Sequence, residues 1–133
     1  EAEMQVRNID NNLFVMDEAS YDRFNAVVER FIAVDADASY ALYRFLSPLF
    51  QQAYAEIGFR NQRFDDTLRS AINAVLAAEV VEGPHQLVKP SVMFLYADAS
   101  IENLQEVHKL LIRMGPENAA KIKAQLREFG DRL

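Results

Sequence analysis

The segment 40–57 most constrains the fold, because most of its residues are apolar over the length of about five helical turns. Its polar residues form a narrow stripe that consists of Arg44, Ser47, Gln51, Gln52 and Glu56. A helix that is apolar around most of its circumference is typical of the middle of a bundle. Pro48 removes one backbone hydrogen bond inside this segment. We therefore expect a kinked central helix that ends at Gly58.

Apolar residues spaced three and four apart predict further helices on both sides of this segment. The expected helices cover about 21–34, 64–78, 98–114 and 116–133. Asp35 and Asp98 are suitable N-cap residues, and Gly115-Pro116 ends one helix and begins the next.

Two segments lack this periodicity. Residues 1–12 are polar, and we expect a disordered or frayed tail there. Residues 87–96 are compatible with a short helix that begins at Pro90 or with a short strand that has no obvious partner. The predicted fold is all-α, with a single helical domain over 13–133 built as a bundle of five to six helices around the kinked one.

Charge is unevenly distributed along the 133-residue chain, whose net charge is −6. Residues 1–39 carry nine acidic and three basic side chains, residues 40–108 carry eight and five, and residues 109–133 carry three and six. The resulting local charges are −6, −3 and +3. A net negative field and the absence of a concentrated basic face argue against nucleic-acid binding. No apolar run is long enough to span a bilayer.

Catalytic and metal-binding patterns are not found in the sequence. The chain has no cysteine and four glycines, which excludes thiol chemistry and a Gly-rich phosphate loop. His85 and His108 do not form a helical metal motif; we expect His85 to be exposed to solvent and His108 to pack against apolar neighbours. Asp65 and Asp66 complement the dipole of a helix N-terminus. We therefore predict no enzymatic activity, no metal and no cofactor.

Two groups of residues remain candidates for a site. Tyr43, Arg44, Tyr54 and Tyr96 combine aromatic and polar character and could line a pocket or an interface. The simpler alternative is that the tyrosines pack inside and direct their hydroxyls to the rim. The second group flanks the Gly115-Pro116 corner and consists of Arg113, Glu117 and Asn118. A turn required by the fold explains the glycine and the proline better than it explains these three residues.

Several separate motifs keep a characteristic order along the chain. The most specific is 109–118, Lys-Leu-Leu-Ile-Arg-Met-Gly-Pro-Glu-Asn, and the others lie at 41–44, 48–50, 82–84, 87–90 and 96–98. In these motifs the chain resembles, over roughly residues 14–130, a bacterial family known as domain of unknown function 3014. The resemblance implies an N-terminal membrane anchor and a Pro-rich linker, both absent from this chain, with this domain at the periplasmic face of the inner membrane. A cytoplasmic location is the alternative. No activity is established for this family, so the resemblance assigns no functional role to any residue of the chain.

These observations favour a non-enzymatic protein-interaction module of the bacterial cell envelope. The partner would be another protein or a second copy of the chain, with the basic end of one copy against the acidic end of the other. The alternative function is a small-molecule or lipid-binding helical domain, with a pocket lined by Tyr43, Tyr54 and Tyr96.

Overall fold

The computed structural model describes residues 3–91 and 93–133, which form two compact units. Unit 1 comprises the described residues of 1–29 and 79–120, and unit 2 comprises residues 30–78 and 121–133.

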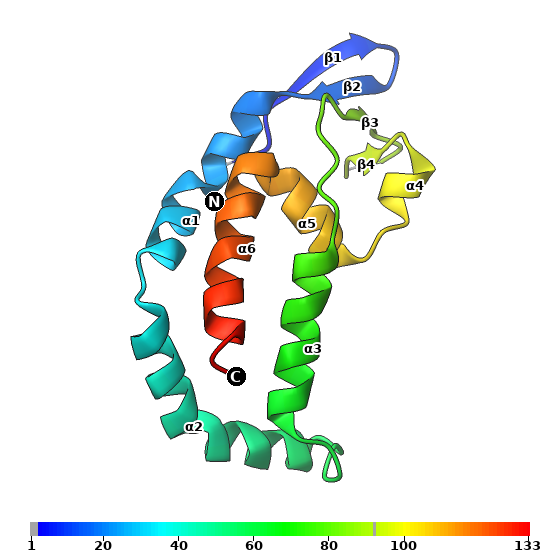
Figure 1. The fold of residues 1–133 in the computed structure, drawn as a ribbon. Helices are drawn as coiled ribbons and strands as arrows, with labels where there is room; N and C mark the ends of the chain where they lie inside the picture. The colour runs from blue at the N-terminus through cyan, green and yellow to red at the C-terminus, as the bar shows by residue number, and fades with distance from the viewer. Residues whose placement is uncertain (1–2, 92) are drawn as a thin grey trace. The chain divides into compact units, whose positions relative to one another are not determined.

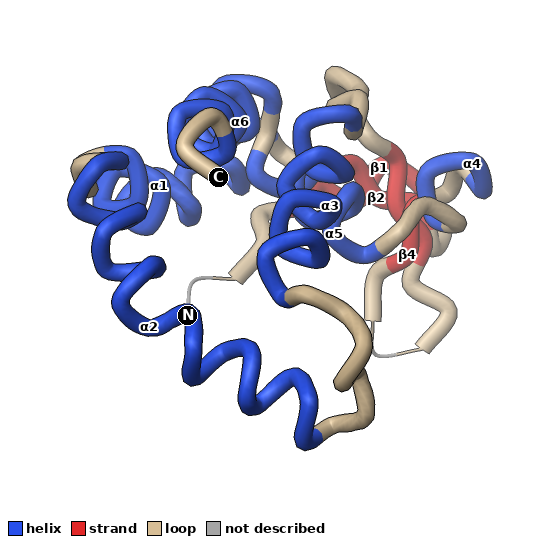
Figure 2. Tube along the Cα trace, turned by 60° about the horizontal axis from the view of Figure 1, so that its bottom comes forward, coloured by secondary structure: helices blue, strands red, loops and turns tan. Residues whose placement is uncertain are grey.

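Unit 1 contains a four-stranded antiparallel sheet in the order β1-β2-β3-β4. The strands are β1 (Val6–Asp10), β2 (Leu13–Met16), β3 (Gln86–Val88) and β4 (Leu95–Tyr96). Figure 2 shows strands of this sheet in red, with the short helix α4 (Ala99–Glu102) beside β4. The prediction of an all-α fold is therefore wrong, and the protein is of the mixed α/β type.

There is a physical reason why the sequence does not reveal these strands. Each is only two to five residues long, so it carries little periodicity of its own, and β2 pairs with a strand some seventy residues away. β1 occupies part of the expected frayed tail, and a hairpin turn at Asn12, with a φ of 54°, joins it to β2. The segment 87–96 is extended at both ends: its first end belongs to β3, which pairs with β2, and its last end is β4, which pairs with β3.

The helical part of unit 1 is more broken than its periodicity predicts. A 3-10 helix, η1 (Glu18–Phe24), precedes α1 (Asn25–Ile32). Asp98 caps α4 by accepting a hydrogen bond from Ser100 N at 2.9 Å, as predicted, but that helix stops at Glu102 and α5 (Glu106–Met114) begins separately. The core of this unit gathers around the sheet: Met16, Leu87, Tyr96, Ile101 and Ile112.

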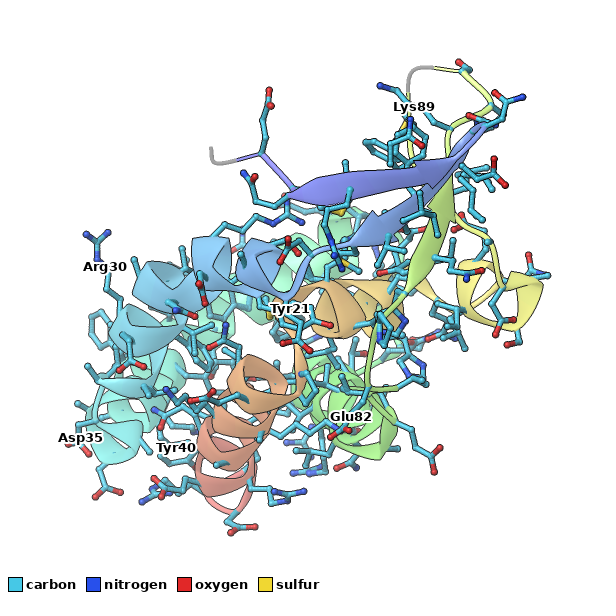
Figure 3. The ribbon with its side chains drawn as sticks, turned by 90° about the horizontal axis from the view of Figure 1, so that it is seen from above. Tyr21, Arg30, Asp35, Tyr40, Glu82 and Lys89 are labelled. Carbon is cyan, nitrogen blue, oxygen red and sulfur yellow. The ribbon has the colours of Figure 1, made fainter. Side chains whose placement is uncertain are left out.

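The predicted corner between α5 and α6 (Pro116–Gly130) is confirmed. Gly115 has a φ of 89°, a conformation that L-residues rarely adopt, and a Cβ at this position would lie 2.6 Å from Tyr21 Cγ. Figure 3 shows Tyr21 beside α5, and contacts join η1 to this helix. Glycine is therefore required here by both the backbone and the neighbouring ring.

Unit 2 contains α2 (Ala36–Glu56), α3 (Phe64–Ala77), the end of α1 and most of α6. Asp35 caps α2 as predicted, since its side chain accepts a hydrogen bond from Asp37 N at 3.3 Å. α2 contains Pro48 and bends along its length in Figure 1. Only Ala36 and Tyr43 of this helix are buried, so the expectation of a central buried helix is wrong.

Candidate functional site

An apolar pocket of about 480 Å³ lies within unit 2. Its walls come from four segments of the chain: the end of α1 with the residues that follow it, α2, α3 and α6. The lining residues are Phe31, Val34, Ser39, Tyr43, Phe50, Phe64, Leu68, Ile72, Gln125, Leu126 and Phe129. Almost all of the exposed lining surface is apolar, with Ser39 and Gln125 as the polar exceptions besides the Tyr43 hydroxyl.

Helical spacing explains why these side chains share one space. Phe64, Leu68 and Ile72 are four residues apart on α3 and therefore line one side of that helix. Ser39 and Tyr43 are likewise four apart on α2. The pocket lies between these sides of α2 and α3 and the lining residues of α6.

Several of the lining side chains form a cluster of aromatic rings, with Tyr43 at its centre. The Tyr43 ring stacks on Phe50 at a centroid distance of 5.9 Å and meets Phe129 edge-on at 5.9 Å. Phe64 lies 5.4 Å from Phe50 and 6.4 Å from Tyr43. Tyr40, labelled in Figure 3, adds an edge-on contact to Phe129 at 6.2 Å. These contacts hold the rings in defined orientations.

The Tyr43 hydroxyl is engaged by a charged group outside the apolar lining. It donates a hydrogen bond to Asp65 Oδ1, while Asp65 Oδ2 accepts from Arg44 Nη1 at 3.2 Å and from Arg63 Nη2 at 3.4 Å. Burial and this hydrogen bond raise the pKa of Tyr43 to about 12. The same bond, aided by the two guanidinium groups, lowers the pKa of Asp65. Tyr43 is thus neutral and Asp65 ionised at physiological pH.

Asp65 therefore does more than complement a helix dipole. It joins the beginning of α3 to the middle of α2 through Tyr43 and Arg44. The sequence identified Tyr43 and Arg44 as candidates but not their carboxylate partner, because the contact spans more than twenty residues.

Tyr54 lies next to this cluster without lining the pocket. Its ring stacks on Phe59 at 4.6 Å and meets Phe64 edge-on at 5.6 Å. Its hydroxyl lies 2.9 Å from Thr67 Oγ1. Tyr54 therefore supports Phe64, which does line the pocket.

Other polar groups of unit 2 are also engaged with each other. Arg132 Nε forms an ion pair with Asp37 Oδ1 at 2.5 Å. Gln125 Nε2 donates to the Val34 carbonyl oxygen at 2.7 Å, which joins two of the lining residues. Arg44, Arg63 and Arg132 thus all have carboxylate partners.

Tyr96 and Arg113 belong to unit 1 and are not among the lining residues. Tyr96 is 7% exposed and packs in the core of unit 1, where burial raises its pKa to about 12 against the opposing charge of Arg113. These two candidates lie close enough to interact with each other. The pocket lining contains one of the three tyrosines expected there.

Asn118 and Glu117 begin α6 on the far side of the Gly115 corner. Asn118 is 5% exposed, and its Nδ2 lies 2.9 Å from Asn25 Oδ1 and 3.3 Å from the Tyr21 carbonyl oxygen. It holds α6 against η1 and α1 within unit 1, which is a structural role. Glu117 is exposed in the first turn of α6, where a carboxylate complements the helix dipole.

The histidines are both placed in unit 1. His85 is 4% exposed, its Nε2 lies 3.0 Å from the Val81 carbonyl oxygen, and its ring meets Tyr96 edge-on at 5.8 Å. The prediction that His85 is exposed is therefore wrong. Burial lowers its pKa. His108 is partly buried and makes a hydrogen bond with the Glu79 carbonyl oxygen.

Two further properties concern the described residues, 3–91 and 93–133. Among them, no three or more histidine, aspartate or glutamate side chains are grouped so that they could hold a metal ion. In the same part of the chain, no helix is both long and apolar enough to cross a bilayer.

The fold and the site define a mixed α/β domain with an apolar pocket among the helices of one of its units. The chain belongs to the family of proteins of unknown function DUF3014, whose family model matches residues 1–130. This match confirms the resemblance seen in the sequence. Comparisons with curated proteins and with solved structures gave no match.

Proposed function

We propose that this protein binds a small, uncharged, predominantly apolar molecule in the pocket of unit 2. The observation that carries the proposal is the cavity of about 480 Å³ with its almost wholly apolar lining. Pockets for small molecules commonly have about 300–1,000 Å³ and combine apolar walls with a few polar groups. A whole α-helix, about 10 Å across with its side chains, needs more room than this.

The charges around the pocket favour a neutral ligand. Arg44 and Arg63 share Asp65, and Arg132 is bound to Asp37, so each of these guanidinium groups already has a carboxylate partner. A ligand carboxylate would have to displace one of them or enter an apolar space without a partner, which is costly. Ser39 and Gln125 offer neutral hydrogen-bonding groups to a hydroxyl, an ether or an ester.

A fluorescence titration with N-phenyl-1-naphthylamine tests the proposal, since this neutral dye brightens in apolar sites. At about 0.3 kcal/mol for each of its about 17 non-hydrogen atoms, binding would reach about 5 kcal/mol, or a dissociation constant of the order of 10⁻⁴ M. The anionic dye 8-anilinonaphthalene-1-sulfonate serves as the comparison and should bind more weakly.

The matched variants are Leu68→Trp, which places a larger ring in the pocket, and Ile57→Trp, which adds the same ring at a 71% exposed position outside it. Leu68→Trp should weaken dye binding at least about tenfold, a loss of about 1.4 kcal/mol. Ile57→Trp should leave dye binding unchanged. Equal binding by both variants, each with the wild-type circular dichroism spectrum, would exclude the pocket as the dye site.

A protein-interaction role at the cell envelope is the second candidate, and the exposed apolar face of α2 supports it. Leu42, Phe45 and Leu49 are 59%, 80% and 61% exposed. Groups of apolar side chains on a surface often mark a site of association. Pull-down of the full-length protein from native envelope, with and without Phe45→Asp, tests this role. Loss of a specific partner on Phe45→Asp is the expected result; the absence of any partner would contradict the role, and equal retention by both forms would contradict the α2 face as its site.

A further inference from the structure

Two polar side chains, Ser39 and Gln125, interrupt the apolar lining of the pocket in unit 2, and we call them the polar pair. Ser39 lies in the first turn of α2, and Gln125 lies on α6. Gln125 Nε2 donates a hydrogen bond to the Val34 carbonyl oxygen at 2.7 Å. Ser39 N donates to the carbonyl oxygen of the next residue, Asp35, at 2.9 Å; Asp35 is labelled in Figure 3. Both members of the pair therefore lie beside the same segment of backbone, which joins α1 to α2.

The polar pair lies one helical turn away from two of the aromatic rings. Tyr43 follows Ser39 by four residues on α2, and Phe129 follows Gln125 by four residues on α6. Residues four apart lie on the same side of a helix. The rings of Tyr43 and Phe129 meet edge-on at a centroid distance of 5.9 Å. A ligand that reaches the polar pair therefore also has aromatic surface beside it.

The hydrogen-bonding capacity of the polar pair is specific. The Val34 carbonyl oxygen can only accept, so this contact identifies the nitrogen of the Gln125 amide and leaves Oε1 as an acceptor. In the described part of the chain, 3–91 and 93–133, no donor is bonded to Gln125 Oε1 and no partner to Ser39 Oγ. A serine hydroxyl can donate as well as accept. The pair therefore offers a ligand one acceptor, Gln125 Oε1, and one donor, Ser39 Oγ.

We propose that the ligand of this pocket is an alcohol, a neutral molecule whose apolar body carries a hydroxyl group. This inference rests on the proposed function and names the polar group of the ligand. The hydroxyl donates to Gln125 Oε1 and accepts from Ser39 Oγ, while the apolar body packs against the other lining side chains.

The same two contacts discriminate against other neutral ligands. An ether or an ester can accept from Ser39 but cannot donate to Gln125. Its binding would displace water from Gln125 Oε1 without replacing the hydrogen bond, which is costly. A hydrocarbon would leave both members of the pair without a partner.

Displacement of N-phenyl-1-naphthylamine by 4-butylphenol and by its methyl ether, 4-butylanisole, tests this assignment. The ether is the more hydrophobic of the two, so the informative quantity is the ratio of their dissociation constants, compared between protein variants. Ser39→Ala and Gln125→Met each remove one polar group with little change in side-chain size. Ser70→Ala is the control, because Ser70 is an exposed serine of α3 that does not line the pocket.

We expect the wild type to prefer the phenol over the ether about threefold to tenfold more strongly than Ser39→Ala and Gln125→Met do. This is the range for the loss of one neutral hydrogen bond. Ser70→Ala should keep the wild-type ratio.

Failure of 4-butylphenol to displace the dye would overturn the proposal, as would a wild-type ratio in either pocket variant. Gln125→Met also removes the bond to Val34, so Ser39→Ala decides the question if Gln125→Met loses the wild-type circular dichroism spectrum. Equal dye binding by Leu68→Trp and Ile57→Trp would instead contradict the pocket and, with it, both proposals. Dye binding in the pocket with an unchanged ratio contradicts only the alcohol, so the two failures can be distinguished.

Discussion

The Gly115→Ala substitution tests how the corner between α5 and α6 is built. Gly115 has a φ of 89° and a ψ of 163°, a region of the Ramachandran map that is essentially restricted to glycine and costs other residues about 1–3 kcal/mol. The added Cβ would also lie 2.6, 2.7 and 3.0 Å from three atoms of the Tyr21 ring. Overpacking of this kind typically costs a further 1–3 kcal/mol.

The backbone of Tyr21 is held in place beside the added methyl group, because its carbonyl oxygen accepts a hydrogen bond from Asn118 and η1 packs against α5. We therefore expect Gly115→Ala to lower the free energy of unfolding by about 2–6 kcal/mol. That is a large part of the roughly 5–15 kcal/mol by which such domains are stable.

Urea unfolding followed by circular dichroism at 222 nm measures this loss, since the chain contains no tryptophan to report by fluorescence. Gly58→Ala is the control, because Gly58 has a φ of 110° and nothing within 4 Å of the added Cβ. It should cost only the backbone strain. The double variant Gly115→Ala with Tyr21→Ala should recover at least about 1 kcal/mol relative to the sum of the single changes. Strict additivity, or equal losses at Gly115 and Gly58, would refute the role assigned to the Tyr21 ring.

Three further predictions concern single side chains. Tyr43→Phe should lower the free energy of unfolding by about 1–2 kcal/mol, because Asp65 loses a hydrogen bond but keeps Arg44; NMR titration should show the pKa of Asp65 rising, and an unchanged pKa would contradict the contact. Burial lowers the pKa of His85, so below about pH 6.5 the unfolded chain binds a proton that the folded chain does not. The free energy of unfolding should therefore decrease as the pH decreases, by up to about 1.4 kcal/mol per pH unit. In urea unfolding between about pH 7.5 and 5, His85→Phe should remove that part of the slope; an unchanged slope would contradict this role of His85. Asn118→Ala should cost about 1–3 kcal/mol in thermal unfolding, whereas a loss below 0.5 kcal/mol would show that its hydrogen bonds add little.

The features that the sequence predicts correctly are those that depend on residues close together in the chain. Asp35, Asp98 and the Gly115-Pro116 corner were identified correctly, because capping and turn formation depend on neighbouring backbone groups. α3 was also predicted almost to the residue. The apolar periodicity of 98–114 was read as one helix, but the structure interrupts it after Glu102. Periodicity reports which side faces inward and does not reveal a break.

The sequence could supply only part of the candidate site. Tyr43 and Arg44 were correct candidates, yet Asp65, which joins them, was assigned only a local role. The rings around Tyr43 include Phe50, Phe64 and Phe129, which come from three helices. The sequence does not indicate that the apolar sides of these helices leave about 480 Å³ between them.

What the sequence by itself determined is therefore local: the helix segments, several of their ends, the family and the absence of recognisable catalytic motifs. Only the tertiary structure decided that β2 has a partner in β3, that α2 is exposed on one side and that a pocket lies on the other. The physical reason is the range of the interactions involved. Capping, turns and helical periodicity act over about four residues, whereas strand pairing and pocket formation depend on residues far apart in the chain.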